Sequence, residues 1–201
     1  AAGTASRSAA RVQAPSAGLS ETAGAFVIRV RPGWDESSEA TFHRLFSWSD
    51  GSDVLDIFWN ASQWAIQNNR TGGAAAETHN SDAHSWDVGD VLTVVSKWSA
   101  SDMWIAHSGG ALNMQGSRAE VPDLASVTTI DIGSSQLTAN RELYGDVLWF
   151  AWYGPGGALL SDADSAYLNS LGTVVDPTAL PLFEHLVGFW DGRSGAFLDF
   201  R

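Results

Sequence analysis

Apolar and polar residues alternate along several short segments of the chain, which is the pattern of half-buried β-strands. In the segment 25–31, written AFVIRVR, the residues Phe26, Ile28 and Val30 form one face of such a strand. Clusters of Gly, Ser, Asn and Asp separate the segments and indicate turns. The other segments predicted as strands are 42–48, 54–60, 63–68, 90–98, 103–112 and 126–135.

The segment 145–168, GDVLWFAWYGPGGALLSDADSAYL, departs from this alternation because residues 148–153 are all apolar. A sandwich strand that faces a second sheet on one side and is covered by a helix or loop on the other can be apolar on both faces. Ser161 or Asp162 can cap a following helix, and Gly172 can end it. We therefore expect a fully buried strand followed by one short helix.

Short strands at regular intervals with one late helix predict an all-β protein, a two-sheet antiparallel jelly-roll sandwich. We expect a flexible arm of small residues at 1–10 and a jelly-roll domain at 11–172. A C-terminal extension at 173–201, rich in Phe and Trp, is expected to pack on the domain or on a neighbouring subunit. The Gly- and Ala-rich segment 70–86 is predicted to be a long surface loop.

Composition narrows the function classes. The 201 residues carry a formal net charge of −12 and a single lysine, which disfavours nucleic acid as a partner. The chain has no cysteine, which excludes disulfides and thiolate chemistry. The sequence contains no run of about 20 apolar residues, the length that a membrane span needs. Its N-terminal residues lack the apolar core of a secretory signal.

The order of four segments carries a resemblance to a known family. These are VLTVVSKW (91–98), SGGAL (108–112), TTIDIGSS (128–135) and the segment that begins with YGDV (144–147). Together they resemble the concanavalin A-like lectin/glucanase superfamily in its laminin-G-like form, over residues 11–172. The cysteine-free, tryptophan-rich sequence is also similar to laminin-G-like proteins of tailed phages. That similarity implies a virion protein on the exterior of a tail or capsid.

The resemblance does not itself choose between catalysis and binding. Glucanases of the superfamily carry a Glu-x-Asp-x-x-Glu strand, which places a pair of carboxylates on one face. This sequence has no Glu-x-Asp, no Gly-x-Ser-x-Gly elbow and no phosphate-binding loop. We therefore expect a protein that is not an enzyme.

Ten tryptophans suggest packed surfaces, sugar-stacking platforms, or both. Most tryptophans of a sandwich belong to its core, so for any single tryptophan a core position is favoured over sugar binding. The candidates for carbohydrate binding, chosen because amide side chains or turns lie beside them, are Trp59, Asn60, Trp64, Trp98 and Trp104.

Calcium is the one metal that the resemblance makes a candidate, since some laminin-G-like domains bind it at a loop rim. Asp50 and Asp53, on either side of Gly51, are weak candidate ligands. Turn formation explains the same residues better. No other cofactor is expected.

The leading hypothesis is a non-enzymatic structural or adhesion component of a phage virion, on the tail or capsid surface, that binds glycans or stabilises the shell. Its partners would be other virion proteins or self-copies, held through the termini, and cell-surface glycans. The alternative is a secreted or cell-surface carbohydrate-binding module of a bacterium. A glycosidase or polysaccharide lyase is a third and weaker hypothesis.

Overall fold

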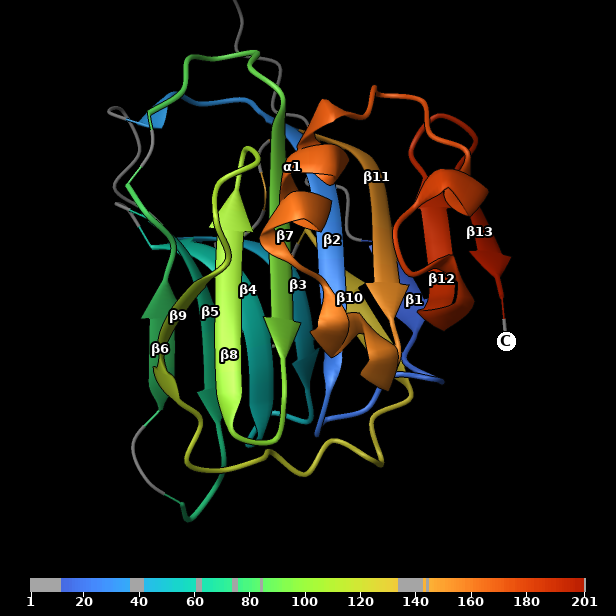
Figure 1. Ribbon diagram of the computed structural model, residues 1–201. Helices are drawn as coiled ribbons and strands as arrows, with labels where there is room; N and C mark the ends of the chain where they lie inside the picture. The colour runs from blue at the N-terminus through green and yellow to red at the C-terminus, as the bar shows by residue number, and fades with distance from the viewer. Residues whose placement is uncertain are drawn as a thin grey trace, which may run out of the picture.

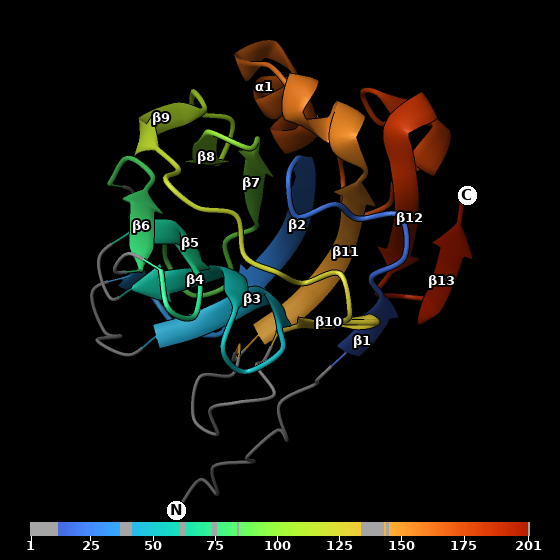
Figure 2. The same cartoon turned by 90° about the horizontal axis from the view of Figure 1, so that it is seen from below.

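Two antiparallel β-sheets lie face to face, and a short helix covers the outer side of one of them (Figures 1 and 2). This is the predicted all-β jelly-roll sandwich. The computed structural model describes residues 12–36, 42–60, 63–73, 76–83, 85–133, 143 and 145–200. The predicted N-terminal arm, 1–10, lies outside the described residues.

The six-stranded sheet is formed by the first strand of the chain, a late strand, and four consecutive strands that lie between these two in sequence. Its spatial order is β1 (Val12–Pro15), β10 (Thr129–Ile132), β3 (Phe42–Ser49), β4 (Val54–Asn60), β5 (Trp64–Asn69) and β6 (Glu77–Asn80).

The seven-stranded sheet joins strands from the beginning, middle and end of the chain. Its spatial order is β13 (Ala196–Asp199), β12 (Leu186–Asp191), β11 (Gly145–Tyr153), β2 (Gly24–Pro32), β7 (Leu92–Trp98), β8 (Asp102–His107) and β9 (Asn113–Ser117).

Each segment predicted as a strand contains one, but the predicted surface loop at 70–86 is wrong in part. It contains β6, whose four residues ETHN pair with β5. Only His79 of this strand is buried. An edge strand with one buried side chain has no apolar alternation, so the pattern gave no sign of it.

The interior between the sheets holds most of the aromatic residues. Trp86 lies at the centre of a cluster, with its ring centroid 4.6 Å from that of Trp59 and 5.7 Å from that of Trp64. The Trp86 indole also donates a hydrogen bond of 3.0 Å to the carbonyl of Trp34. Eight of the ten tryptophans are buried, so the tryptophan content of the sequence is mainly a property of the core.

The apolar run 148–153 lies in β11, and from Trp149 to Tyr153 both faces of this strand are buried as predicted, whereas Leu148 is partly exposed. Phe150 and Trp152 point between the sheets, whereas Trp149 and Tyr153 belong to a second apolar cluster on the outer side. Leu160 and Leu168 cover that second cluster.

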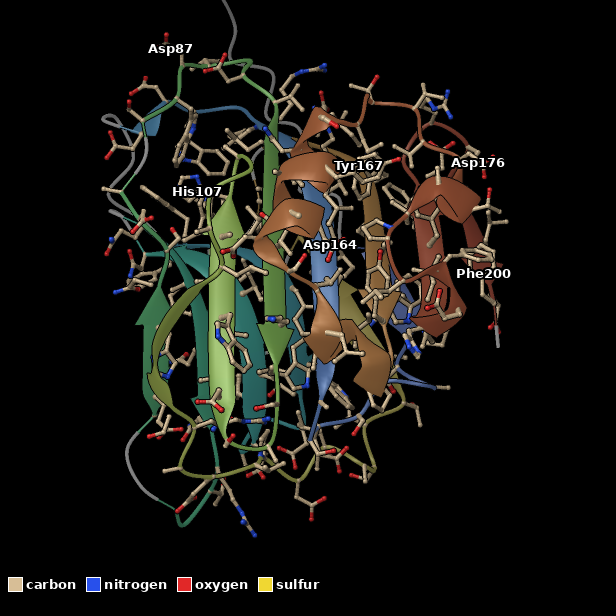
Figure 3. All side chains as sticks on the ribbon, in the orientation of Figure 1. Asp87, His107, Asp164, Tyr167, Asp176 and Phe200 are labelled. Carbon is tan, nitrogen blue, oxygen red and sulfur yellow. The ribbon has the colours of Figure 1, made fainter. Side chains whose placement is uncertain are left out.

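The predicted helix is α1 (Asp162–Ser170), and Figures 2 and 3 show it over the seven-stranded sheet. Ser161 caps it: its hydroxyl accepts from the amide of Asp164, and the Asp164 carboxylate accepts from the amide of Ser161. This reciprocal capping box satisfies two amides that the helix itself leaves unpaired.

The last segment, 173–201, contributes two strands to the seven-stranded sheet. β12 pairs with β11, with Phe150 opposite Trp190, and β13 pairs with β12. This segment also holds two short 3₁₀ helices, η3 (Pro177–Ala179) and η4 (Phe183–His185), and a third, η2 (Pro155–Leu159), lies between β11 and α1. Within the described residues, no helix has the length and apolar character needed to cross a membrane.

Candidate functional site

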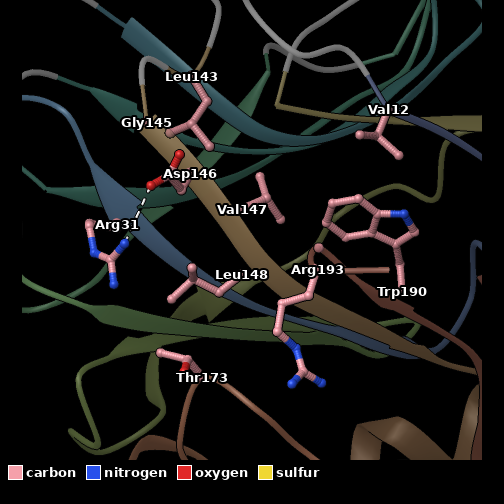
Figure 4. A pocket seen from close by; sticks show the side chains of 11 residues that line it. Val12, Arg31, Leu143, Gly145, Asp146, Val147, Leu148, Thr173, Trp190 and Arg193 are labelled. Atoms are coloured by element: carbon pink, nitrogen blue, oxygen red, sulfur yellow. Dashed lines mark hydrogen bonds and ion pairs between the residues drawn. The ribbon is translucent and has the colours of Figure 1, made fainter. Parts of the chain in front are cut away.

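A pocket of about 400 Å³ opens where several strands begin or end. Its wall comes from the start of β1, the end of β2, the start of β11 and the chain that follows β12 (Figure 4). The volume falls within the range of small-molecule sites, about 300–1,000 Å³. The lining residues are Val12, Arg31, Leu143, Gly145, Asp146, Val147, Leu148, Thr173, Trp190, Gly192 and Arg193.

Two glycines allow the strands to converge here. A Cβ at Gly192 would lie 2.3 Å from the carbonyl oxygen of Val147, and one at Gly145 would lie 2.3 Å from that of Arg31. Gly145 also has a φ of +154°, which side chains rarely adopt. The sequence therefore permits a close backbone approach at the pocket wall that other residues would block.

One side of the pocket is apolar and aromatic. Trp190 is half-buried, and its ring stacks on that of Phe150 with the centroids 5.3 Å apart and the planes at 20°. Val12 and Val147 are also partly buried and pack against the same core. Since Phe150 supports its inner face, Trp190 presents a fixed aromatic surface to the pocket.

The other side carries charged groups. Arg31 and Asp146 form an ion pair, with Nη1 and Oδ2 3.4 Å apart, and their side chains are 41% and 44% exposed. Figure 4 shows this pair across the pocket from Trp190. Arg193 is paired with Asp191 at 2.7 Å, and its guanidinium lowers the pKa of that carboxyl.

The described lining residues do not include the pair of carboxylates that most glycoside hydrolases use. Asp146 is the only carboxylate among the described lining residues, and none of those residues is His, Cys or Ser. Glycoside hydrolysis needs two carboxylates that flank the bond. The pocket can instead offer an aromatic surface, a hydroxyl from Thr173, one carboxylate and two guanidinium groups.

For three of the tryptophans predicted to bind carbohydrate, the structure contradicts the prediction. Trp59, Trp64 and Trp98 are each no more than 1% exposed, because they point between the two sheets. The indole of Trp98 donates to the carbonyl of Ser20 at 2.9 Å. None of the three can stack on a sugar in this conformation.

The predicted Asn60 supports a turn. Its side-chain nitrogen donates to Asn80 at 2.9 Å, and its side-chain oxygen accepts from the amide of Gln63 at 2.9 Å. These bonds hold the β4–β5 turn and the neighbouring β6, so the amide already has partners within the sheet.

Trp104 is the one predicted tryptophan that keeps an exposed surface. It is half-buried on the outer face of the seven-stranded sheet, and the ammonium of Lys97 lies 4.8 Å from its ring centroid. Lys97 also donates to the carbonyl of Leu160, and burial lowers the pKa of this lysine. One face of Trp104 is therefore occupied by a cation.

Asp50 and Asp53, the candidate calcium ligands, hold backbone amides. Asp50 accepts from the amides of Ser52 and Asp53 at 2.8 and 2.7 Å. Asp53 accepts from the amides of Thr71 and Asp123, and these bonds lower the pKa of its carboxyl. In the part of the chain that the structure describes, no three acidic, His or Cys side chains form a group that could hold a metal ion.

A row of polar residues crosses the outer face of the six-stranded sheet. Asp56 in this row is fully buried and forms an ion pair with Arg44. The middle of the row is closed to solvent, so we interpret it as structural. From one edge strand to the other, the row consists of Gln13, Asp131, Ser47, Asp56, Gln67 and Thr78.

The pocket residues Arg31, Asp146, Trp190 and Arg193 were not predicted as a site. They lie in three separate parts of the sequence and meet only because β11 pairs with both β2 and β12. The sequence FWDGR (189–193) does carry a signal, since it places an aromatic residue beside a charged turn. Because apolar residues precede Trp190 in the sequence, packing of this segment on the domain was the simpler interpretation.

Comparison with known proteins supports the fold class. No protein-family model matches the chain, and no curated protein matches it significantly. The carbohydrate-binding module CBM40 of the Ruminococcus gnavus IT-sialidase is similar over 75% of this chain and 84% of that one, with a TM-score of 0.61 and 16% identity. The same module has been solved with α2,6-sialyllactose bound.

Two further structures share the arrangement at lower scores. The SAP-like pentraxin of Limulus polyphemus covers 88% of this chain and 79% of its own, with a TM-score of 0.53 and 10% identity. Domain 4 of AbnA, an extracellular arabinanase of Geobacillus stearothermophilus solved with arabinotriose, covers 77% and 69%, with a TM-score of 0.50 and 12% identity. At such identities the likeness shows the fold alone, a two-sheet jelly-roll sandwich.

Proposed function

We propose that this protein is a non-enzymatic glycan-binding module and that the pocket beside Trp190 is its binding site. The observation that carries this proposal is the position of Trp190. Of ten tryptophans, only Trp104 and Trp190 are not buried, and Trp190 lines the pocket next to polar and charged side chains.

The chemistry of the pocket suits a sugar. A pyranose ring has an apolar face of C–H groups, which can pack on an aromatic ring, and a rim of hydroxyls that need hydrogen-bond partners. Thr173, Asp146 and the two arginines offer such partners around the Trp190 surface. A site of this kind is mostly apolar with a few polar groups that fix the orientation of the ligand.

The structural neighbours support the same class of function. Among those named above, the sialidase module and the arabinanase domain were solved with oligosaccharides bound. The sialidase neighbour is a carbohydrate-binding module by its description. Binding without catalysis therefore agrees both with these neighbours and with the single carboxylate of the pocket.

The test is a glycan array followed by titration calorimetry on the best ligand, with Trp190→Ala and Trp104→Ala as matched variants. Both replace a half-buried tryptophan on the seven-stranded sheet. We expect Trp190→Ala to weaken binding at least tenfold, which is about 1.4 kcal/mol, and Trp104→Ala to leave the Kd unchanged. Loss of binding in Trp104→Ala alone would move the site to the outer face of that sheet.

Trp190→Phe controls for folding, because it keeps an aromatic ring on Phe150. It should retain the melting temperature and a measurable part of the affinity. Turnover of β-glucans or alginate, abolished by replacing a single Asp or Glu, would contradict the non-enzymatic part of the proposal.

The setting of the module is a separate part of the proposal. A place on the exterior of a phage virion follows from the resemblance in sequence, whereas the arabinanase neighbour is described as extracellular. In both settings the module would meet glycans outside a cell. Portal, capsid or tail genes beside the coding gene would support the virion setting, and a gene cluster for polysaccharide breakdown would contradict it.

A further inference from the structure

We propose that the glycan bound in this pocket carries a carboxylate, which Arg31 binds, while Arg193 adds positive charge to the rim. This inference rests on the proposed function and makes it more specific. It concerns the charge of the ligand, which stacking on the aromatic surface of Trp190 does not determine.

The positions of the cationic groups carry the inference. Seven of the chain's Lys and Arg residues lie in the described part of the chain, and four of these are held within the fold by a buried carboxylate or by backbone carbonyls. Arg44 pairs with the buried Asp56. The other three donate to backbone carbonyls within the fold: Arg29 to Asn169, Lys97 to Leu160, and Arg118 to Glu21 and Ser99.

The remaining three described cations are Arg31, Arg70 and Arg193. Two of them line the same pocket. In a chain with a net charge of −12, these two guanidinium groups are the cations that an anionic group of a ligand in the pocket would meet, and each of them lies beside an aspartate.

Arg31 has donors to spare. Among the described residues it makes one hydrogen bond, from Nη1 to Asp146, and this bond is long at 3.4 Å. A guanidinium has five N–H donors in a planar fork that matches a carboxylate with two parallel bonds. Arg193, by contrast, already uses its Nε and Nη2 groups on the carboxylate of Asp191, at 3.1 and 2.7 Å.

Asp146 provides a test of the inference, because its carboxylate competes with that of the ligand for Arg31. Its negative charge would also repel a carboxylate bound nearby. Asp146→Asn keeps a hydrogen-bonding side chain but removes both effects. An acidic sugar should therefore bind this variant more tightly, whereas a neutral sugar that uses Asp146 as an acceptor should not.

The experiment compares each acidic probe with its neutral counterpart by calorimetry. The probes are oligogalacturonate against its methyl ester, and sialyllactose against lactose. We expect at least one acidic probe to bind about tenfold or more tightly than its counterpart, a difference that shrinks at high salt. Arg31→Gln should remove that preference, and Arg31→Lys should restore only part of it because lysine lacks the planar fork.

Arg70→Gln is the matched control, since it removes the same charge from an exposed arginine outside the pocket. It should keep the preference. Arg193→Gln should reduce the preference less than Arg31→Gln does. Arg31 and Asp146 are exposed enough that losing their ion pair should leave the melting temperature nearly unchanged.

The outcomes separate this inference from the proposed function. Equal binding of acidic and neutral probes, with both weakened by Trp190→Ala, would overturn the inference and leave the proposed function standing. A preference for acidic probes that survives Arg31→Gln, or weaker acidic binding by Asp146→Asn, would also overturn it. Failure of every glycan to bind would overturn both.

Discussion

The two sheets of this sandwich have outer faces of opposite character. On the seven-stranded sheet, α1 and the 3₁₀ segments cover Trp149, Ala151 and Tyr153, and the face is apolar. On the six-stranded sheet, a polar row that includes Asp56 and Gln67 crosses all six strands. The inner faces of both sheets are apolar and share one core.

This contrast shows what determines the pattern of a strand. A strand whose second face is covered by apolar side chains becomes apolar throughout, as β11 does. A strand whose second face is partly polar keeps part of its alternation, as β4 does: Leu55, Ile57 and Trp59 point inward, and Asp56 shares the outward face with Phe58. The following variants test whether the two faces also differ in how they stabilise the protein.

The largest effect is expected from Trp149→Ala on the covered face. It removes a fully buried indole from the second cluster and breaks the bond of 3.2 Å from that indole to the carbonyl of Gly172. The free energy of unfolding should fall by about 3–5 kcal/mol, measured by chemical denaturation. Trp104→Ala, on the same outer face but half-buried, is the control and should cost less than half as much. Equal losses would mean that the helix cover contributes little.

Asp56→Ala should give the largest effect on the polar face, a loss of about 3 kcal/mol, because it leaves the Arg44 guanidinium buried without its carboxylate. Gln67→Ala, in the same row but half-buried, should cost much less. The double variant Arg44→Met/Asp56→Leu should regain most of the lost stability. A double variant as unstable as Asp56→Ala would show that the ion pair itself, and not the unpaired charge, is what matters.

Asp53→Asn should have an intermediate effect, about 1–2 kcal/mol at neutral pH, because an amide oxygen can replace only one of the two acceptors that hold Thr71 and Asp123. Backbone hydrogen bonds lower the pKa of Asp53 in the folded protein. The stability that this carboxylate contributes is therefore present above its unfolded pKa of about 3.9, and is lost as the pH falls through the lower folded value.

The pH dependence of Asp53→Asn supplies its own check. The difference between wild type and variant should be constant at neutral pH and should shrink below about pH 4, in denaturation curves recorded across that range. Asp50→Asn is the control, since asparagine forms the same turn. A difference that grows in acid would contradict the assignment of the pKa shift.

The smallest effect is expected from Ser161→Ala, which removes the hydroxyl of the capping box and should cost about 1 kcal/mol. Hydrogen exchange of the α1 amides should accelerate, while that of β4 should not. Ser170→Ala at the other end of α1 is the control. Equal acceleration in both variants would show that the capping box contributes nothing specific.

The fold was largely predictable because its signals are local. Alternation located β2, β3, β4 and β7, and the serine cap located α1. The short edge strand β6 was not predictable, since its stability comes from backbone pairing with β5 rather than from apolar side chains.

The site was much less predictable, for a physical reason. Whether a tryptophan points into the core or towards solvent depends on which face of its strand meets the other sheet. Trp59 is followed by Asn60 and Trp64 is preceded by Gln63, yet both tryptophans are buried. Trp190 and Arg31 are 159 positions apart in sequence and meet through strand pairing that no local pattern encodes.

The position of Lys97 has a practical consequence. It is the only lysine of the chain, it lies in β7 between two paired strands, and its ammonium is bound to the carbonyl of Leu160. An endoprotease that cuts only after lysine therefore has one target bond, and reaches it only when β7 separates from both β2 and β8. The rate of that single cleavage would measure how often this end of β7 separates from its neighbours, and saturation of the pocket with ligand should slow it if the ligand stabilises the whole fold.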